Sequence, residues 1–212
     1  AVEELGVPPQ QVHIINNGTP DYGRLATRQG DPVSVVFIGA VGERKGVDLL
    51  LRALAGLSSD VEWVTRICGD GEVDKYRVMA ESHGLTDDKV VFLGWQSAEQ
   101  IQKVLLEADL FVLPSRAENQ PVAIIEAMAV GLPVIASDVG DIPNQVVNGR
   151  TGIIVSAGDH HSLRVALQRL INSRDERDTM SKLARQQFLD HYSIEKTVSS
   201  VFLLYRSVLS GA

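Results

Sequence analysis

The chain has 212 residues, of which 44% are hydrophobic and 22% are charged, and its formal net charge is −7. A chain of this length can bury a large core without disulfide bonds or metal ions. The negative charge argues against nucleic acid as a partner, because phosphate backbones require a basic face. The single Cys68 excludes an internal disulfide and fits a reducing compartment. No apolar run reaches the roughly 18 residues of a membrane span, and residues 1–9 lack the apolar core of a signal peptide, so we expect a cytoplasmic protein.

The first half of the chain predicts strands that alternate with helices. Residues 1–11 resemble the end of a helix, and residues 12–17 predict a short strand followed by a turn over 17–21. The near-continuous apolar run at 33–39 predicts a strand that is covered on both faces. We then expect an amphipathic helix at 47–57, a strand at 61–69, a helix at 72–83, a strand at 90–95 and a helix at 99–107 capped by Ser97.

Residues 110–137 predict one complete βαβ unit. A buried strand at 110–113 leads into a polar loop at 114–120, a helix that Pro121 opens and Gly131 ends, and a second buried strand at 133–136. After this unit we expect a long loop at 137–152, a strand at 153–155, a helix from the cap Asp159 to 172, and helices at about 176–190 and 194–209. Five or six strands alternating with helices predict a single α/β domain with a doubly wound, Rossmann-like parallel sheet.

The loop over residues 39–46, GAVGERKG, is the first candidate for a binding site. Its glycines leave backbone amides accessible, and Arg44 and Lys45 directly precede a predicted helix. Backbone N–H groups, a helix dipole and two cations together suit a diphosphate. The loop matches neither the P-loop pattern nor GxGxxG, and short glycine motifs often occur without function. Taken alone, it fits a phosphate site and a solvated turn about equally.

The second candidate is the segment from Glu118 to Glu126. Free amides of Val122 and Ala123 at the helix start would face an anion in the loop. Two carboxylates do not suit a phosphate, but they can accept hydrogen bonds from sugar or ribose hydroxyls. Eight residues is also the spacing of an ordinary charged stripe on a helix, and spacing alone favours that simpler interpretation.

Other conspicuous residues are weaker candidates. The segment GDG at 69–71 fits a tight turn better than a site. His160 and His161 are neighbours that point to different faces of a helix, so we predict no metal site. Cys68 lies within an apolar strand and is predicted as a core residue.

Taken in order, the candidate loops resemble the carboxyl-terminal half of retaining glycosyltransferases of the family-4, or glycosyl transferases group 1, type. The resemblance covers nearly the whole chain, and Glu118 and Glu126 fall on the paired glutamates of that family. The segments that carry it are NGTPD, GAVGERKG, ICGDG, VVFLGW, LFVLPS, ENQPVAIIEAMAVGLPVIASDVG and VNGRTGIIV. The resemblance implies one half of a GT-B fold, in which two Rossmann-like domains face a cleft and this half binds the nucleotide sugar.

The resemblance also implies a role for each candidate residue. Arg44 and Lys45 would hold the diphosphate of a UDP- or GDP-sugar and offset the charge on the leaving nucleotide in place of a metal ion. Glu118 would contact the transferred sugar, and Glu126 would bind the ribose hydroxyls. The other donor-binding positions would contribute backbone around the phosphates, sugar and base: Gly39, Gly46, Leu93, Gly94, Asn119, Gln120 and Val122.

The implied reaction is transfer of a hexosyl unit, with retention, to a glycan, lipid or other acceptor. Enzymes of this type need an amino-terminal domain that supplies the acceptor site, so we expect this chain alone to bind donor but transfer little. The helix at 194–209 is expected to pack against that domain through an apolar outer face. Contact of the full-length enzyme with the inner face of the membrane is compatible with this interpretation.

Two positions depart from the family pattern. Ala40 stands where the family often has Arg, and Asn144 stands where Glu is frequent. These departures support an alternative hypothesis, a nucleotide-sugar-binding or assembly module without catalysis. A sugar-nucleotide epimerase of similar architecture is a third and less favoured hypothesis, because its active site also spans two domains.

Overall fold

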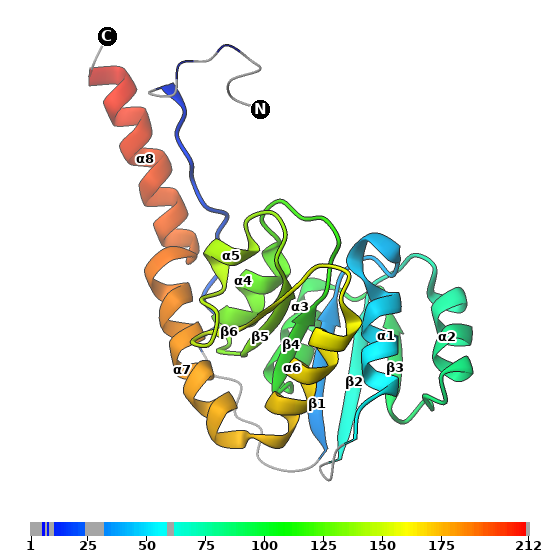
Figure 1. Ribbon diagram of the computed structural model, residues 1–212. Helices are drawn as coiled ribbons and strands as arrows, with labels where there is room; N and C mark the ends of the chain where they lie inside the picture. Colours follow the sequence, from blue (N-terminus) through cyan, green and yellow to red (C-terminus); the bar gives the residue numbers. More distant parts are fainter. Residues whose placement is uncertain (1–5, 7, 9–10, 24–31, 59–61, 211–212) are drawn as a thin grey trace.

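The structure is a computed structural model that describes residues 6, 8, 11–23, 32–58 and 62–210. Its centre is a six-stranded parallel sheet covered by helices on both faces (Figure 1). The strands are β1 (Val33–Ile38), β2 (Trp63–Cys68), β3 (Val90–Gly94), β4 (Leu110–Leu113), β5 (Val134–Ser137) and β6 (Gly152–Val155). Their order is β3-β2-β1-β4-β5-β6, so the strand order reverses between β1 and β4. The predicted doubly wound, Rossmann-like sheet is confirmed.

Helices form a layer on each face of this sheet. On one face α1 packs against α2 and α6, and on the other α4 packs against α3 and α7. The helices are η2 (Glu43–Lys45), α1 (Val47–Ala55), α2 (Val73–Ser82), α3 (Ala98–Leu106), α4 (Val122–Ala129), α5 (Ile142–Gln145), α6 (His160–Asn172), α7 (Arg174–His191) and α8 (Ile194–Ser210). The short helix α5, within the long loop after β5, was not predicted.

The core follows the apolar runs of the sequence. Phe37 in β1 and Phe111 in β4 have no exposed surface, as expected for strands that are covered on both faces. Cys68 is buried at the end of β2, which confirms the predicted core position. Burial raises the pKa of its thiol to about 11, so the thiol stays protonated at neutral pH.

Two predicted helix starts are confirmed by their caps. The Ser97 hydroxyl accepts a hydrogen bond from the backbone N–H of Gln100, whose side chain accepts from the Ser97 N–H, which makes a capping box. Asp159 accepts from the backbone N–H groups of His161 and Ser162. Helix α4 begins at Val122, one residue later than predicted, so Pro121 is its N-cap residue and not its first helical residue.

The predicted strand at 12–17 is wrong. These residues form no strand, and the only sheet-like pairing nearby is an isolated bridge between Thr19 and Ser193. The backbone of the segment instead makes hydrogen bonds with side chains, because Asn17 donates to Gln120 and Asn16 accepts from Thr197. Of the predicted helix end at 1–11, residues 1–5, 7 and 9–10 lie outside the described residues.

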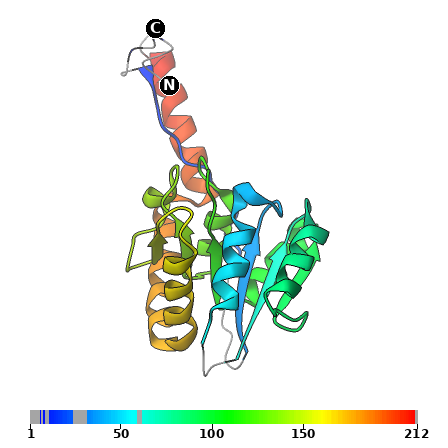
Figure 2. The same ribbon diagram turned by 45° about the vertical axis from the view of Figure 1, so that its right-hand side comes forward.

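Helix α8 extends away from the sheet, and residues 13–15 run beside it (Figures 1 and 2). The structure assigns no buried residue to α8. Its exposed apolar side chains are Val198, Phe202, Leu203, Tyr205, Val208 and Leu209. The predicted apolar outer face is therefore confirmed. Among the described helices, none combines the length and apolar character that crossing a bilayer requires.

Candidate functional site

Two loops meet beside the point where the strand order reverses. One follows β1 and covers residues 39–46, and the other follows β4 and covers residues 114–120. Carboxyl ends of neighbouring parallel strands lie at the same edge, and ligands of open α/β sheets bind outside such a reversal. The loops touch directly, because the Arg116 N–H donates a 2.8 Å hydrogen bond to the carbonyl of Arg44.

Three of the predicted site residues come together in these loops. The Lys45 ammonium lies 2.6 Å from a Glu118 carboxylate oxygen that also accepts a 2.7 Å hydrogen bond from the Ser115 hydroxyl. The Lys45 and Glu118 side chains are only 15% and 6% exposed. Arg44 lies beside them, 4.0 Å from the second Glu118 oxygen, with 62% of its side chain exposed. One buried ion pair therefore stands next to a cation that is open to solvent.

A second ion pair fixes the same two loops. Arg116 donates to both carboxylate oxygens of Asp48, at 2.7 and 2.6 Å, and to the Glu43 carbonyl at 2.5 Å. Burial acts to raise the pKa of Asp48, but the hydrogen bonds and charge of Arg116 outweigh burial and hold that pKa below its ordinary value. The sequence placed Arg116 in the polar loop but gave no role to it or to Asp48.

Glycine is required where these loops pass closest to other backbone. Gly46 has φ 72°, and a Cβ there would lie 1.9 Å from the Pro114 carbonyl oxygen. A Cβ on Gly69 would lie 1.9 Å from the Gly39 carbonyl oxygen. The segment GDG at 69–71 therefore supports the candidate loop from the neighbouring strand, and its Asp70 carbonyl accepts from the Val41 N–H at 2.6 Å.

Gln120 links the site to the amino-terminal segment. Its side-chain oxygen accepts from the Asn17 N–H at 2.6 Å, and its side-chain amide donates to Asn16 at 3.0 Å and to Asp141 at 2.6 Å. Sequence reasoning expected the backbone around Gln120 to face a ligand and missed these side-chain contacts. Neighbouring Asn119 is exposed, and its carbonyl accepts from the Asp141 N–H at 2.7 Å.

The two departures from the family pattern have different surroundings. Asn144 donates a 2.6 Å hydrogen bond to Asp141, so a Glu at this position would place a second carboxylate beside that Asp. The Asn therefore fits the network that Asp141 forms here. Ala40 is exposed directly after Gly39, and its methyl side chain provides no charge at the loop.

Glu126 differs from the other predicted charges in its surroundings. It is half-buried in α4, and it makes no hydrogen bond or ion pair with any residue in the described part of the chain. Burial raises the pKa of its carboxyl. Burial and the charge of Glu126 also raise the pKa of Tyr22, a neighbour that the sequence did not indicate. Val122, in the first turn of α4, is exposed.

Leu93 and Gly94 lie at the same edge but farther along it. They end the outer strand β3, which β2 separates from β1. The Leu93 carbonyl accepts from the Gln96 side chain and the Gly94 carbonyl from the Gly69 N–H, both at 2.8 Å. Exposed Trp95 follows them. The predicted positions therefore extend along one sheet edge rather than forming one contact cluster.

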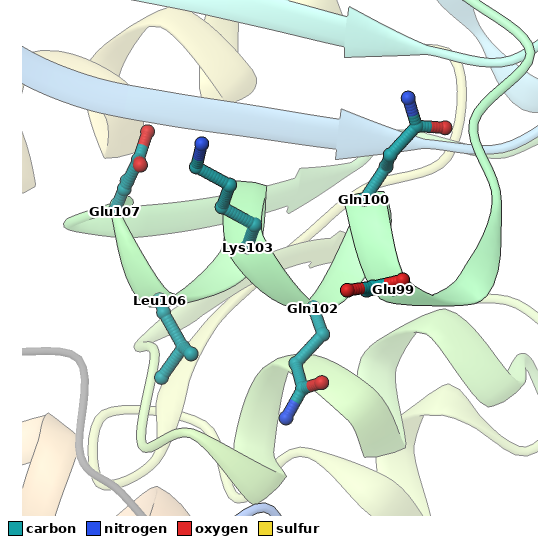
Figure 3. Close-up of a pocket in the computed structure, with 6 residues that line it drawn as sticks. All are labelled: Glu99, Gln100, Gln102, Lys103, Leu106 and Glu107. Carbon is teal, nitrogen blue, oxygen red and sulfur yellow. The ribbon is translucent and has the colours of Figure 1, made fainter.

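A hollow of about 700 Å³ lies elsewhere, along the outer side of α3 (Figure 3). One helix supplies its whole lining, and the labelled side chains point in different directions instead of converging. The lining residues are Glu99, Gln100, Gln102, Lys103, Leu106 and Glu107. None of the predicted site residues lines this hollow.

Comparisons with known proteins agree with this architecture. The sequence model of the family described as Glycosyl transferases group 1 matches residues 25–187. The amylovoran biosynthesis glycosyltransferase AmsK of Erwinia amylovora is 30% identical over 188 residues, which cover 83% of this chain and 45% of AmsK. The D-inositol 3-phosphate glycosyltransferase of Corynebacterium urealyticum is 31% identical over 214 residues, covering 95% of this chain and 50% of that enzyme.

Solved structures share the fold. Sucrose-phosphate synthase from Thermosynechococcus elongatus has a TM-score of 0.87 at 24% identity, covering 100% of this chain and 56% of that one. HepE from Anabaena has a TM-score of 0.82 at 20% identity, covering 98% and 60%. The chain thus spans about half the length of the curated relatives that it matches.

Proposed function

The chain belongs to the glycosyl transferases group 1 family, and from this premise we propose that it is the donor-binding domain of a retaining hexosyltransferase. The donor is a nucleoside-diphosphate sugar such as a UDP- or GDP-sugar, and the acceptor is a glycan, lipid or other molecule. Two proteins of similar fold support the donor class, because HepE is known in complex with UDP-glucose and TarM of S. aureus in complex with UDP.

The observation that carries this proposal is the meeting of Arg44, Lys45 and Glu118 at the strand-order reversal. Two cations beside a helix start suit a diphosphate, and a carboxylate within reach of the same space suits sugar hydroxyls. Exposed Arg44 is free to approach a phosphate. Together, these residues match the charge pattern of a nucleotide sugar, which is anionic at the diphosphate and hydroxyl-rich at both ends.

In this proposal, the Lys45–Glu118 ion pair separates when the donor binds. Without donor, Lys45 neutralises the nearly buried Glu118. An incoming diphosphate attracts Lys45 and leaves the carboxylate available to accept hydrogen bonds from sugar hydroxyls. When the bond from the anomeric carbon to the diphosphate breaks, the phosphate oxygen gains charge, and Arg44 and Lys45 stabilise that charge without a metal ion.

Other residues bind the nucleoside end of the donor in this proposal. Glu126, which lacks a partner among the described residues, accepts from the ribose hydroxyls. Backbone groups at Gly39, Gly46, Asn119, Gln120 and Val122 surround the phosphates and sugar, and those at Leu93 and Gly94 border the base. The first-turn amides of α4 face the diphosphate, because they have no partner within the helix.

Catalysis requires a second domain in this proposal. These relatives are about twice as long as this chain, and we assign the acceptor site to a part of the enzyme outside the chain. Helix α8 presents six exposed apolar side chains, a surface that favours protein contact over water. We propose that α8 packs against that domain, and that the enzyme works in the cytoplasm, with peripheral contact to the inner face of the membrane.

Calorimetric titration of the chain with UDP, GDP and ADP, alone and as their glucose conjugates, tests donor binding. At least one should bind below millimolar concentration, and the conjugate should bind more tightly than its diphosphate. Glu126→Gln should weaken both ligands, whereas Glu118→Gln should remove only the increment due to the sugar. Absence of binding by every ligand at millimolar concentration would overturn the proposed function.

A non-catalytic nucleotide-sugar-binding module is the second candidate, and exposed Ala40 favours it because this position offers no cation. The two candidates differ in the full-length protein. Ala40→Arg should tighten diphosphate binding in either case. Hydrolysis of the bound nucleotide sugar by the full-length wild type, with release of free nucleoside diphosphate, supports the enzyme and excludes the module.

A further inference from the structure

Arg116 is the residue that joins the two loops of the candidate site most extensively. Its backbone N–H donates to the Arg44 carbonyl at 2.8 Å. Its guanidinium donates to both oxygens of Asp48, at 2.7 and 2.6 Å, and to the Glu43 carbonyl at 2.5 Å. One residue of the loop after β4 therefore contacts Glu43 and Arg44 in the loop after β1 and Asp48 in the first turn of α1.

The two arginines at the site differ in how their donors are used. The Arg116 guanidinium binds a carboxylate through two parallel hydrogen bonds, an arrangement that fixes the orientation of both groups. Arg44 makes one 3.2 Å hydrogen bond to the Ala117 carbonyl and a 4.0 Å contact with Glu118. Its side chain is 62% exposed, against 33% for Arg116. Arg44 is thus available to a ligand, whereas Arg116 is committed to protein partners.

The residues that Arg116 holds flank the two cations in sequence. Glu43 and Arg44 belong to η2, and Asp48 is the second residue of α1, so Lys45 lies between the fixed points. The β4 loop also holds Lys45 itself through Glu118, with Ser115 supporting the carboxylate. Because the backbone on both sides of Lys45 is fixed, only its side chain has to turn from Glu118 to an arriving phosphate, which favours binding.

We propose that Arg116 and Asp48 form a positioning pair, which holds the segment from Glu43 to Lys45 in the geometry that binds the donor diphosphate. This inference rests on the proposed function. Arg116 acts through Arg44 and Lys45 and does not itself contact the phosphates. Asp48 is as necessary as Arg116, although its charge would repel a phosphate.

The test is a double-mutant cycle on the full chain, with UDP, GDP and ADP as calorimetric probes. Arg116→Ala and Asp48→Asn should each weaken the diphosphate that binds by roughly tenfold, and the double variant should be no weaker than the worse single variant by more than about twofold. Arg116→Lys should not restore affinity, because an ammonium cannot reproduce two parallel hydrogen bonds. Arg169→Ala, which breaks a 2.7 Å pair with Glu176 on α6 and α7, should leave affinity unchanged.

Two outcomes would overturn the inference. If Arg116 itself binds phosphate, Asp48→Asn will leave affinity unchanged or raise it while Arg116→Ala lowers it. If the pair serves only folding, the variants will lose melting temperature and will bind the diphosphate and its parent nucleoside with equal relative loss. A positioning role instead confines the loss to the increment that the phosphates contribute.

A measurement without ligand separates this inference from the proposed function. The Arg116 amide should exchange with solvent roughly tenfold faster in Asp48→Asn than in the wild type, because its hydrogen bond to Arg44 is released. Normal binding of a diphosphate by both variants overturns the positioning role and leaves the donor site standing. Failure of the wild type to bind any diphosphate, with faster exchange in the variant, overturns the donor site while showing that the pair orders the loop.

Discussion

The body of the domain and helix α8 differ in how completely the described chain supplies their contacts. In the body, apolar side chains are buried, and the charged groups where the two site loops meet are paired with one another. In α8, no residue is buried and six large apolar side chains are exposed. Helices α7 and α8 follow one another and have similar lengths, of 18 and 17 residues. An amphipathic sequence therefore predicts that one face of a helix is suited to apolar contacts. It does not predict which segment makes those contacts.

The largest expected effect comes from two phenylalanines on these successive helices. Phe188 in α7 is 0% exposed and Phe202 in α8 is 60% exposed, and an arginine lies over each ring. Phe188→Ala should lower the free energy of unfolding by about 4 kcal/mol, whereas Phe202→Ala should change it by less than about 0.5 kcal/mol. Urea denaturation of the chain measures both. A similar loss in both variants would contradict the distinction between body and α8.

The close approach of the site loops can be tested with two glycines of matched conformation. Gly46 and Gly84 have φ of 72° and 73°, but only Gly46 faces the Pro114 carbonyl, and nothing lies within 4 Å of a Cβ at Gly84. Gly84→Val should cost about 1–2 kcal/mol through backbone strain, and Gly46→Val should cost at least about 3 kcal/mol because steric overlap is added. Equal costs in denaturant unfolding would mean that the two loops are not packed closely.

The ion pair inside the site should separate stability from binding. Lys45→Met leaves the nearly buried Glu118 carboxylate with a hydrogen bond from Ser115 and with exposed Arg44 at 4.0 Å as its nearest cation, and should lower the free energy of unfolding by about 2 kcal/mol. The cost stays below that of a fully enclosed pair, because Lys45 retains some contact with solvent. Adding Glu118→Gln should recover most of that stability, since the uncompensated charge is removed.

Ligand binding should not recover in the same double variant. UDP or GDP affinity should remain at least tenfold below the wild type in both variants, because the cation proposed to bind the diphosphate is absent. Recovery of stability and affinity together would show that Lys45 serves the fold alone. The Lys45–Glu118 pair would then be a structural contact like those in the rest of the body.

The sequence predicted the sheet and the two candidate loops because the relevant signals are local. Near-continuous apolar runs mark β1 and β4, and the polar residues that follow them fall at one edge once the sheet is parallel. Arg44, Lys45 and Glu118 could be predicted as neighbours for this reason. The caps at Ser97 and Asp159 are likewise local, because each side chain accepts a hydrogen bond from a backbone N–H three residues later.

Contacts between distant residues were not predictable in the same way. Arg116 and Asp48 are 68 positions apart. No periodicity in the sequence relates a residue of the loop after β4 to a residue in the first turn of α1. Residues 12–17 have strand-forming composition, but their hydrogen bonds go to Gln120 and Thr197, more than 100 positions away. Side-chain partners of this kind override local propensity, and only the tertiary fold specifies them.

The smallest expected effect concerns Glu126, the one predicted site charge in the body for which the described chain supplies no partner. Burial raises the pKa of this carboxyl in the folded state. Between the ordinary and the raised pKa, the folded protein therefore holds a proton that the unfolded chain has released. Its contribution to stability is therefore lost as pH rises from the ordinary carboxyl value through the raised one. Glu126→Gln should be more stable than the wild type at pH 7, by at most about 1 kcal/mol, and equally stable below about pH 4. The same substitution at exposed Glu81 in α2, Glu81→Gln, is the control. If urea denaturation finds Glu126→Gln less stable at pH 7, the carboxylate has a stabilising partner within the chain. If it finds a gain in stability together with weaker UDP or GDP binding, the unpaired carboxylate is retained for a ligand.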